Sequence, residues 1–164
     1  MNQSMLSPDQ SAILNDWRKA GEVIAFTNGV FDLLHAGHVT FLAKAKAMCD
    51  RLVVGLNSDA SVKTLGKGPN RPINPEQDRK VVLEALRCVD LVLIFEDSTP
   101  AQLIEAIQPQ LLIKGGDYDP DCTIETDARY IVGSKMVRES GGTVTVIPLL
   151  PGRSTTGMIK KSQG

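Results

Sequence analysis

The sequence predicts a single-domain α/β protein, in which a parallel, Rossmann-like five-stranded sheet carries helices on both faces. Short aliphatic runs alternate along the chain with segments whose apolar residues recur at helical spacing, a pattern typical of β-α-β units with right-handed crossovers. Hydrophobic residues make up 42% of the chain and aromatic residues only 4%, which fits the aliphatic interior of a parallel sheet. A length of 164 residues suits one domain with a substantial core.

The first predicted element is a helix over Pro8–Ala20, where an amphipathic pattern ends at Gly21, a residue suited to a helix C-terminus. We expect residues 1–21 to form this N-terminal helical segment and residues 22–164 to form the main domain. The five strands are predicted in order from short aliphatic runs, at Glu22–Thr27, Arg51–Leu56, Leu91–Phe95, Gln110–Lys114 and Thr143–Pro148.

Helices are predicted between and after these strands, at His38–Met48, Pro75–Arg87, Pro100–Ile107 and Ala128–Ser140, with a last helical stretch that ends at Lys161. In the second of these helices, the apolar residues expected to face the core are Val81, Val82, Leu83 and Leu86. A long polar connection, residues 63–74, precedes that helix. Functional groups are expected in the loops after the strands, because ligands of open α/β sheets bind beyond the carboxyl ends.

Charge and cysteine content exclude several classes of protein. The 18 basic and 19 acidic residues nearly balance, so we expect no nucleic-acid or anionic-membrane partner. No apolar run approaches the roughly 20 residues of a membrane span, and Met1–Met5 lacks the pattern of a secretory signal. Three widely spaced cysteines, Cys49, Cys88 and Cys122, argue against a disulfide framework and indicate the cytoplasm.

Both histidines of the chain lie in one short segment between the first strand and the next helix, at His35 and His38. Residues three apart at a helix start can face the same side. Three interpretations are open. As donors to phosphate oxygens the histidines would be helped by Gly37, which permits close backbone approach, and by the helix N-terminus. As zinc ligands they would need further ligands from elsewhere, and as core or capping residues they would be structural.

Two other loops carry candidate binding groups. Ser154, Thr155 and Thr156 open the last helix, where hydroxyls either cap the helix or bind phosphate. The loop Lys114–Tyr118 contains paired glycines, with Asp117 as an acceptor for an amine or hydroxyl and Tyr118 as a stacking face; an ordinary tight turn is the alternative. The cations near the active edge either bind phosphate or are solvated: Lys63, Lys67, Arg71 and Arg79.

Three common enzyme signatures are missing from the sequence. A G-x-x-x-x-G-K-[ST] loop is absent, which excludes a P-loop enzyme. No G-x-G-x-x-G follows the first strand, which argues against a dinucleotide oxidoreductase. A G-x-S-x-G elbow of the kind found in serine hydrolases is also absent.

Taken together, these loops resemble the nucleotidyltransferase (cytidylyltransferase-like) superfamily, whose signature is the H-x-G-H turn. The resemblance extends from Val23 to Lys161. Its ordered motifs are Thr27–Asp32, His35–His38, Asn57–Asp59, Arg71–Pro72, Arg79, Val89–Asp90, Lys114–Tyr118 and Ser154–Thr156. Within the superfamily, the combination is most similar to the heptose 1-phosphate adenylyltransferases, in their stand-alone form without a fused sugar kinase.

This resemblance implies that ATP and D-glycero-β-D-manno-heptose 1-phosphate react to give ADP-heptose and pyrophosphate, for the lipopolysaccharide inner core. It also implies a homodimer, and Mg2+ that is bridged by the triphosphate rather than held by side chains. Two alternatives are kept: a cytidylyltransferase acting on a polyol phosphate such as glycerol 3-phosphate, and a nucleotide-binding module without catalysis. Two features depart from the family pattern, the longer segment 119–129 and Arg153, which stands where the family often has a small or apolar residue.

The resemblance implies three groups of site residues. The catalytic group is His35, His38 and Lys67, with Lys67 carried by a segment that brings cations to the phosphates. The nucleotide-binding group is Asn28, Gly29, Phe31, Gly37, His38, Gly116, Asp117, Ser154, Thr155 and Thr156. The substrate-binding group is Asp32, Asp59, Lys63, Arg71, Lys114 and Tyr118.

Overall fold

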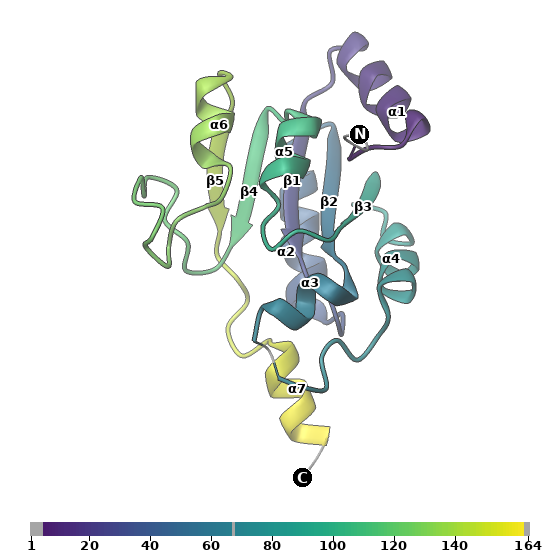
Figure 1. The fold of residues 1–164 in the computed structure, drawn as a ribbon, viewed down its shortest axis with the longest axis vertical. Helices are drawn as coiled ribbons and strands as arrows, with labels where there is room; N and C mark the ends of the chain where they lie inside the picture. Colours follow the sequence, from purple (N-terminus) through teal and green to yellow (C-terminus); the bar gives the residue numbers. More distant parts are fainter. Residues whose placement is uncertain (1–4, 67, 163–164) are drawn as a thin grey trace.

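Five parallel strands form one sheet in the order β3-β2-β1-β4-β5 (Figure 1). Their bounds are β1 Ile24–Gly29, β2 Arg51–Asn57, β3 Leu91–Phe95, β4 Leu111–Gly115 and β5 Thr143–Ile147. The structure is a computed structural model that describes residues 5–66 and 68–162. The predicted fold class is confirmed. After β1, the chain adds β2 and β3 on one side of that strand, and then β4 and β5 on its other side. The strand order therefore reverses between β1 and β4.

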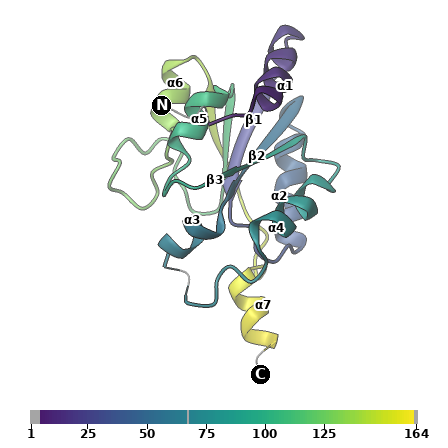
Figure 2. The ribbon, with the colours of Figure 1, turned by 45° about the vertical axis from the view of Figure 1, so that its right-hand side comes forward.

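Helices cover both faces of the sheet (Figures 1 and 2). On one face, α1 (Pro8–Lys19), α5 (Ala101–Ile107) and α6 (Ser134–Glu139) bury apolar residues such as Leu14, Ile104 and Val137 against Phe26 and Leu112. On the other face, α2 (Ala36–Lys46) and α4 (Glu76–Glu84) bury residues that include Leu42 and Leu83 against Val54 and Ile113. Alternating side chains of each strand therefore supply two separate cores.

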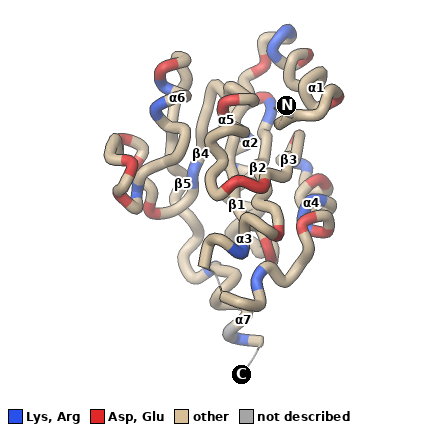
Figure 3. Tube along the Cα trace, in the orientation of Figure 1, with Lys and Arg blue, Asp and Glu red and all other residues tan. Residues whose placement is uncertain are grey.

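Two short helices lie at the carboxyl edge of the sheet. Helix α3 (Asp59–Thr64) follows β2 directly, and α7 (Thr155–Ser162) lies beyond the strand ends in both views (Figures 1 and 2). Basic and acidic residues are interspersed along the chain (Figure 3). Among the described residues, no helix combines the length and the apolar character that crossing a membrane requires.

Several element boundaries differ from the sequence prediction for identifiable reasons. Helix α2 begins at Ala36 rather than His38, because the His35 side chain caps it. Residues 59–64 form a helix that was not predicted and that includes the first two residues of the expected 63–74 connection. It starts because Ser58 Oγ accepts a hydrogen bond from the Ser61 amide at 3.0 Å. Helix α6 begins at Ser134 rather than Ala128, after Gly133 in the left-handed region (φ 86°).

The expected inward face of α4 is partly wrong. Val81 and Val82 are 65% and 49% exposed, whereas Leu83 is completely buried. The buried stripe of α4 is the pair Arg79 and Leu83, one turn apart. The charged side chain of Arg79 occupies a core position. The buried face of α4 therefore does not include Val81 and Val82, which the apolar pattern had predicted to face the core.

Candidate active site

A cavity of about 510 Å3 opens at the carboxyl edge of the sheet, on the side of α2. That volume is within the range of small-molecule sites. The residues that line it come from β1 and the following turn, α2, the segment before α4, the β4 loop and the start of α7. They are Thr27, Asn28, Gly29, Val30, Phe31, Asp32, His35, Gly37, His38, Phe41, Arg71, Lys114, Gly115, Tyr118, Leu149, Arg153, Ser154, Thr155 and Thr156.

The two histidines lie against each other at the start of α2. Their ring centroids are 3.9 Å apart in a stacked arrangement, and the His38 ring lies 5.3 Å from that of Phe31. Phe31 itself has a positive φ of 47°, a conformation that non-glycine residues adopt mainly where surrounding packing enforces it. This turn connects β1 to α2, and both histidine rings line the cavity.

His35 has a defined role in starting α2. Its Nδ1 accepts a hydrogen bond from the Gly37 amide at 3.1 Å, which assigns the proton of the neutral ring to Nε2. Burial, together with the nearby Arg153 guanidinium, lowers the pKa of His35 below its usual 6.5. The ring is therefore neutral at pH 7, and Nε2–H is the group it can donate to a ligand. Capping and ligand binding thus use opposite nitrogens of the same ring.

The turn before α7 packs directly against the start of α2. A Cβ placed on Gly37 would lie 3.0 Å from Arg153 Cβ, so the two helix starts meet at this point. Ser154 Oγ accepts from the Gly157 amide at 3.0 Å, and Thr155 Oγ1 donates to the Leu33 carbonyl at 3.4 Å. Two helix N-termini with their amide groups and dipoles therefore border one cavity, which favours an anionic ligand.

Asp32 fixes the segment that enters the cavity from the α4 side. Its buried carboxylate accepts from Arg71 Nε at 2.6 Å and from the amides of Ile73 and Asn74 at 2.9 Å. Burial alone would raise the pKa of Asp32, but the bonds from Asn74, Ile73 and Arg71 outweigh it and lower the pKa below its usual value. Both carboxylate oxygens are occupied within the protein, so we expect Asp32 to position Arg71 rather than to contact a ligand.

Lys114 spans from β4 to β1 at the back of the cavity. Its Nζ donates to Asn28 Oδ1 at 2.6 Å and lies 5.2 Å from the centre of the Tyr118 ring. Burial lowers the pKa of Lys114 to about 8. A half-buried cation with one amide partner and one aromatic face, and no carboxylate partner among the described residues, is well placed to bind an incoming anion.

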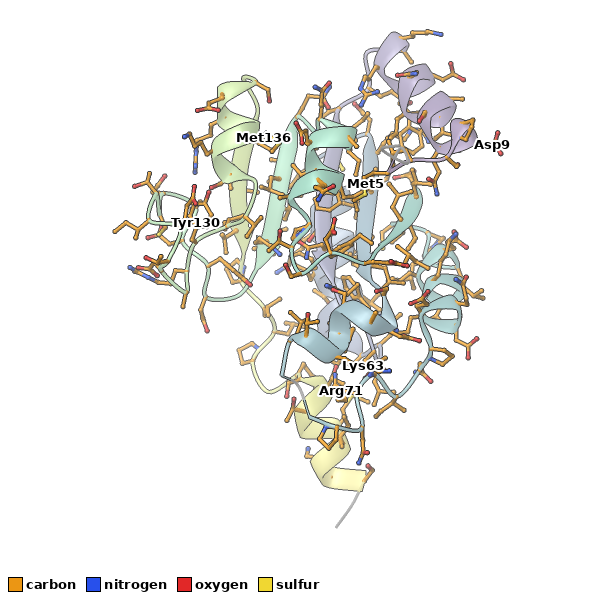
Figure 4. The ribbon with its side chains drawn as sticks, viewed as in Figure 1. Met5, Asp9, Lys63, Arg71, Tyr130 and Met136 are labelled. Atoms are coloured by element: carbon orange, nitrogen blue, oxygen red, sulfur yellow. The ribbon has the colours of Figure 1, made fainter. Side chains whose placement is uncertain are left out.

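The predicted site residues divide into those brought together and those left outside. Thirteen predicted residues line the cavity: Asn28, Gly29, Phe31, Asp32, His35, Gly37, His38, Arg71, Lys114, Tyr118, Ser154, Thr155 and Thr156. Four others do not line it: Gly116, Asp117, Asp59 and Lys63. Asp59 instead accepts from Arg79 Nη2 at 2.7 Å, and Lys63 projects from α3 (Figure 4). Lys67 lies outside the described residues.

Sequence reasoning missed a second cavity of about 360 Å3. It borders the first and shares five of its residues, Asn28, Gly29, Val30, Lys114 and Tyr118. The remaining residues of its wall come from β2, α3, the loop after β3 and the segment before α6: Asn57, Leu65, Ser98, Thr99, Pro100, Tyr130 and Val132. Most of these are neutral and isolated along the chain, so no local pattern marks them.

Arg79 is also more important than its sequence context indicated. It is 2% exposed and its guanidinium donates to the carbonyls of Val30, Asn57 and Asn74 at 2.7–3.0 Å, besides its bond to Asp59. These acceptors lie at the end of β2, just after β1, and in the segment before α4. Arg79 therefore joins the backbone segments that carry the site. In the sequence it stands between Asp78 and Lys80, and only its place among the cations near the active edge and among the motifs of the family resemblance marked it.

Within the described part of the chain, no group of three or more His, Cys, Asp or Glu side chains is arranged to hold a metal ion. The three cysteines, Cys49, Cys88 and Cys122, are all free. The carboxylate that lines the first cavity, Asp32, is already engaged by Arg71 and two amides. The charged groups of the described wall that remain for a ligand are therefore the cations Arg71, Lys114 and Arg153.

Replacing Gly37 by alanine should lower kcat about tenfold or more while the protein stays folded. The added Cβ would lie 2.8 Å from His35 Cε1 and 3.0 Å from Arg153 Cβ, so both groups must shift within the cavity. Steady-state kinetics and thermal unfolding measure the two effects. The control is Ala36→Ser, which changes the neighbouring, exposed position. Gly66→Ala would not serve, because the backbone φ of Gly66 is positive. Unchanged kinetics in Gly37→Ala would contradict the tight packing of this corner.

A family model described as cytidylyltransferase-like matches residues 26–160. Among curated relatives, "Bifunctional protein HldE" of Mesorhizobium japonicum is 52% identical over 145 residues, covering 88% of this chain and 27% of the relative. The HldE protein of Wolinella succinogenes is 50% identical over 163 residues, covering 99% of this chain and 32% of the relative. The chain therefore spans about 30% of the length of these relatives.

Solved structures show the same fold. The lipopolysaccharide core biosynthesis protein from Thermoplasma volcanium has a TM-score of 0.60 at 24% identity, with 79% of this chain and 98% of that chain covered. Pantoate-beta-alanine ligase from Francisella tularensis has a TM-score of 0.57 at 17% identity, with 92% and 69% covered. From the family match and the HldE similarity, the chain belongs to the cytidylyltransferase-like family and is a nucleotidyltransferase.

Proposed function

We propose that this member of the cytidylyltransferase-like family transfers AMP from ATP to D-glycero-β-D-manno-heptose 1-phosphate, giving ADP-heptose and pyrophosphate for the lipopolysaccharide inner core. The observation that carries the proposal is the convergence of two stacked imidazoles, two helix N-termini, Arg71, Arg153 and Lys114 around one cavity of about 510 Å3. The choice of heptose and adenine rests on the motif resemblance and on about 50% identity to HldE proteins.

The chemistry needs positioning more than proton transfer. The second pKa of a phosphate monoester is about 6, so the acceptor is already a dianion at neutral pH and requires no general base. One of its oxygens forms a bond to the α-phosphorus of ATP, and the bond from that phosphorus to the bridging oxygen breaks as pyrophosphate leaves. Catalysis then comes from aligning the two phosphates and stabilising charge on the transferring group and on the leaving group.

The described residues fit these tasks. His35 Nε2–H and His38 donate to the triphosphate, assisted by the amide groups at the start of α2. The hydroxyls of residues 154–156 and the start of α7 hold the β- and γ-phosphates, with Arg71 and Arg153 as nearby cations. Mg2+ bound with the nucleotide would offset the charge of its phosphates; Asp32, the carboxylate of the described cavity wall, is engaged by Arg71 and the Ile73 amide.

The other predicted residues have the following places in this proposal. Asn28, Gly29 and Phe31 line the nucleotide side of the cavity. Gly116 and Asp117 lie in the loop beyond β4, outside the cavity wall, where a base that extends past the wall would meet them. Lys63 and Lys67 remain proposed cations of the segment after α3. The homodimer and the cytoplasmic location implied by the resemblance and by the three free cysteines are likewise proposals, the first testable by sedimentation.

Pyrophosphate release across matched substrate pairs tests the function. We expect turnover with ATP and β-heptose 1-phosphate, and at least about 100-fold lower kcat/KM with CTP or with glycerol 3-phosphate, because buried polar groups left unpaired by the wrong partner are costly. Preference for CTP with glycerol 3-phosphate would favour the cytidylyltransferase alternative. Nucleotide binding without turnover on any phosphate acceptor would favour a binding module instead.

A further inference from the structure

We propose that the second cavity holds the uncharged sugar of the acceptor, and that Lys114, in the wall shared by the two cavities, binds the acceptor phosphate beside the α-phosphate of the nucleotide. This inference rests on the proposed function, since it divides the substrates of that reaction between two spaces. The first cavity takes the nucleotide and the second, of about 360 Å3, takes the body of the acceptor.

The position of the cavities supports the division. The first is bordered by α2 and the start of α7, and the second by Leu65 at the end of α3, Pro100 at the start of α5 and the segment before α6. The two meet over the ends of β1 and β4, where Lys114 Nζ contacts Asn28 Oδ1 at 2.6 Å. A phosphate at Lys114 therefore faces the triphosphate side, while the group it carries extends to the other side.

The charge of the second cavity indicates the chemistry of its ligand. Among the described residues that line it, Lys114 alone is charged, and no carboxylate contributes to the wall. The first cavity, by contrast, contains Arg71, Arg153 and both histidines. A ligand with one anionic end and a neutral body satisfies the second cavity. An aminoalkyl phosphate would place an ammonium group there without a carboxylate partner.

The polar groups of the second cavity suit a polyhydroxylated body. Asn57, Ser98, Thr99 and Tyr130 offer amide and hydroxyl groups, while Leu65, Pro100 and Val132 offer apolar surface. A sugar presents both kinds of surface, hydroxyl groups around its edge and C–H groups on its faces. Hydrogen-bonding side chains of this kind reject analogues that lack the matching hydroxyl.

The segment between β4 and α6 supplies two of these residues, Tyr130 and Val132, and Tyr130 lies on that loop in Figure 4. The loop is closed by its own bonds: the Asp119 amide donates to the Arg129 carbonyl at 3.0 Å, and Arg129 Nη2 donates to Asp127 at 2.9 Å. Because its closure depends on the loop itself, the segment can present Tyr130 to the cavity independently of the nucleotide site. We infer that Tyr130 is a specificity-determining residue for the sugar.

The test compares Lys114→Met and Tyr130→Phe with the wild-type chain, and uses Lys135→Met, an exposed lysine paired with Glu139, as the matched control. Lys114→Met should raise the KM for heptose 1-phosphate about 10- to 100-fold, the effect of losing a hydrogen bond to a charged group. Tyr130→Phe should raise it about 3- to 10-fold. In both variants, the Kd for a non-hydrolysable ATP analogue should stay within about twofold of wild type, since the nucleotide lies in the first cavity.

The pH dependence of the KM for the acceptor provides a second readout for Lys114. Because its pKa is lowered to about 8, the wild-type KM for the acceptor should rise above that pH, while Lys114→Arg should keep a flat profile. The groups that face Lys114 are Asn28 from β1 and Tyr118 from the β4 loop. The other titratable or charged residues of the two cavities are Asp32, His35, His38, Arg71, Arg153 and Tyr130. These residues are the same in the wild type and in Lys114→Arg, so a difference between the two pH profiles comes from residue 114.

Two results would overturn the inference while leaving the proposed function intact. One is a wild-type enzyme that makes ADP-heptose while Lys114→Met and Tyr130→Phe retain the wild-type KM for the acceptor. The other is equal loss of affinity for ATP analogue and acceptor in Lys114→Met. Preferential use of phosphocholine over heptose 1-phosphate would instead contradict both proposals, because the neutral-body assignment and the heptose assignment would fail together.

Discussion

Replacing His38 by alanine should lower kcat by a factor of about 10²–10³, the usual consequence of removing one preorganised donor from a transition state with developing charge. The ring lies between His35 and Phe31, at 3.9 Å and 5.3 Å between centroids, on the wall of the first cavity. Its orientation is therefore fixed before substrate binds. Because the charge on the leaving pyrophosphate develops, and that on the transferring group is redistributed, only during transfer, the effect should appear mainly in kcat and only weakly in the KM for ATP.

The fold should survive this substitution, because His35 and not His38 caps α2. Single-turnover measurement of ADP-heptose formation, together with thermal unfolding, separates the two properties. Val39→Ala, one residue further along α2 and 39% exposed, is the matched control and should keep wild-type turnover. A folded His38→Ala enzyme with near-normal kcat would contradict the phosphate-stabilising role.

Replacing Arg79 by methionine should lower the free energy of unfolding by about 3–5 kcal/mol, as expected when one member of a buried charged network is removed. Its guanidinium donates to the carbonyls of Val30, Asn57 and Asn74, and the substitution leaves buried acceptors without a donor, at about 1–3 kcal/mol each. Asp59 contributes less, because its side chain is 35% exposed and water can replace the lost bond.

Activity should fall with stability in this variant, since the same carbonyls fix the ends of β1 and β2 beside the cavities. Denaturant unfolding measures the first effect and pyrophosphate release the second. The control is Lys80→Met, the next residue of α4, whose amine forms an i,i+4 pair with Glu84 at 3.6 Å; it should change stability by less than about 0.5 kcal/mol. A loss of similar size in both variants would show that Arg79 has no special role.

The fold class was predictable from sequence because strands and helices of a parallel sheet differ strongly in apolar spacing. The predicted strands Glu22–Thr27 and Leu91–Phe95 both contain apolar runs. The structure places β3 at Leu91–Phe95 as predicted and β1 two residues later than predicted, at Ile24–Gly29. The helix at Asp59–Thr64 was not predictable to the same degree, because its short polar sequence carries no apolar period. It forms because Ser58 caps it and because β2 and Asp97 hold Ser61 in place.

The candidate site was predictable where consecutive residues carry the chemistry. His35, Gly37 and His38 form one local motif, as do Ser154 and Thr155, and the topology brings these motifs to one cavity. The second cavity was not predictable, since Asn57, Thr99 and Tyr130 are far apart in sequence and meet only through the tertiary fold. Asp32 and Asp59 were predicted to bind substrate, but their protein partners, Arg71 and Arg79, were visible only in three dimensions.

The shared wall between the cavities has a consequence for how this protein can diversify. Asn28 and Lys114 border both spaces, so a substitution there changes the place where the two phosphates meet. Tyr130 and Val132 border only the second cavity, and a change in either alters one substrate while leaving the other in place. Substitutions in the 119–132 loop are therefore the simplest route by which a related protein could accept a different acceptor. The residues at the junction of β1 and β4 would have to be retained for the reaction itself.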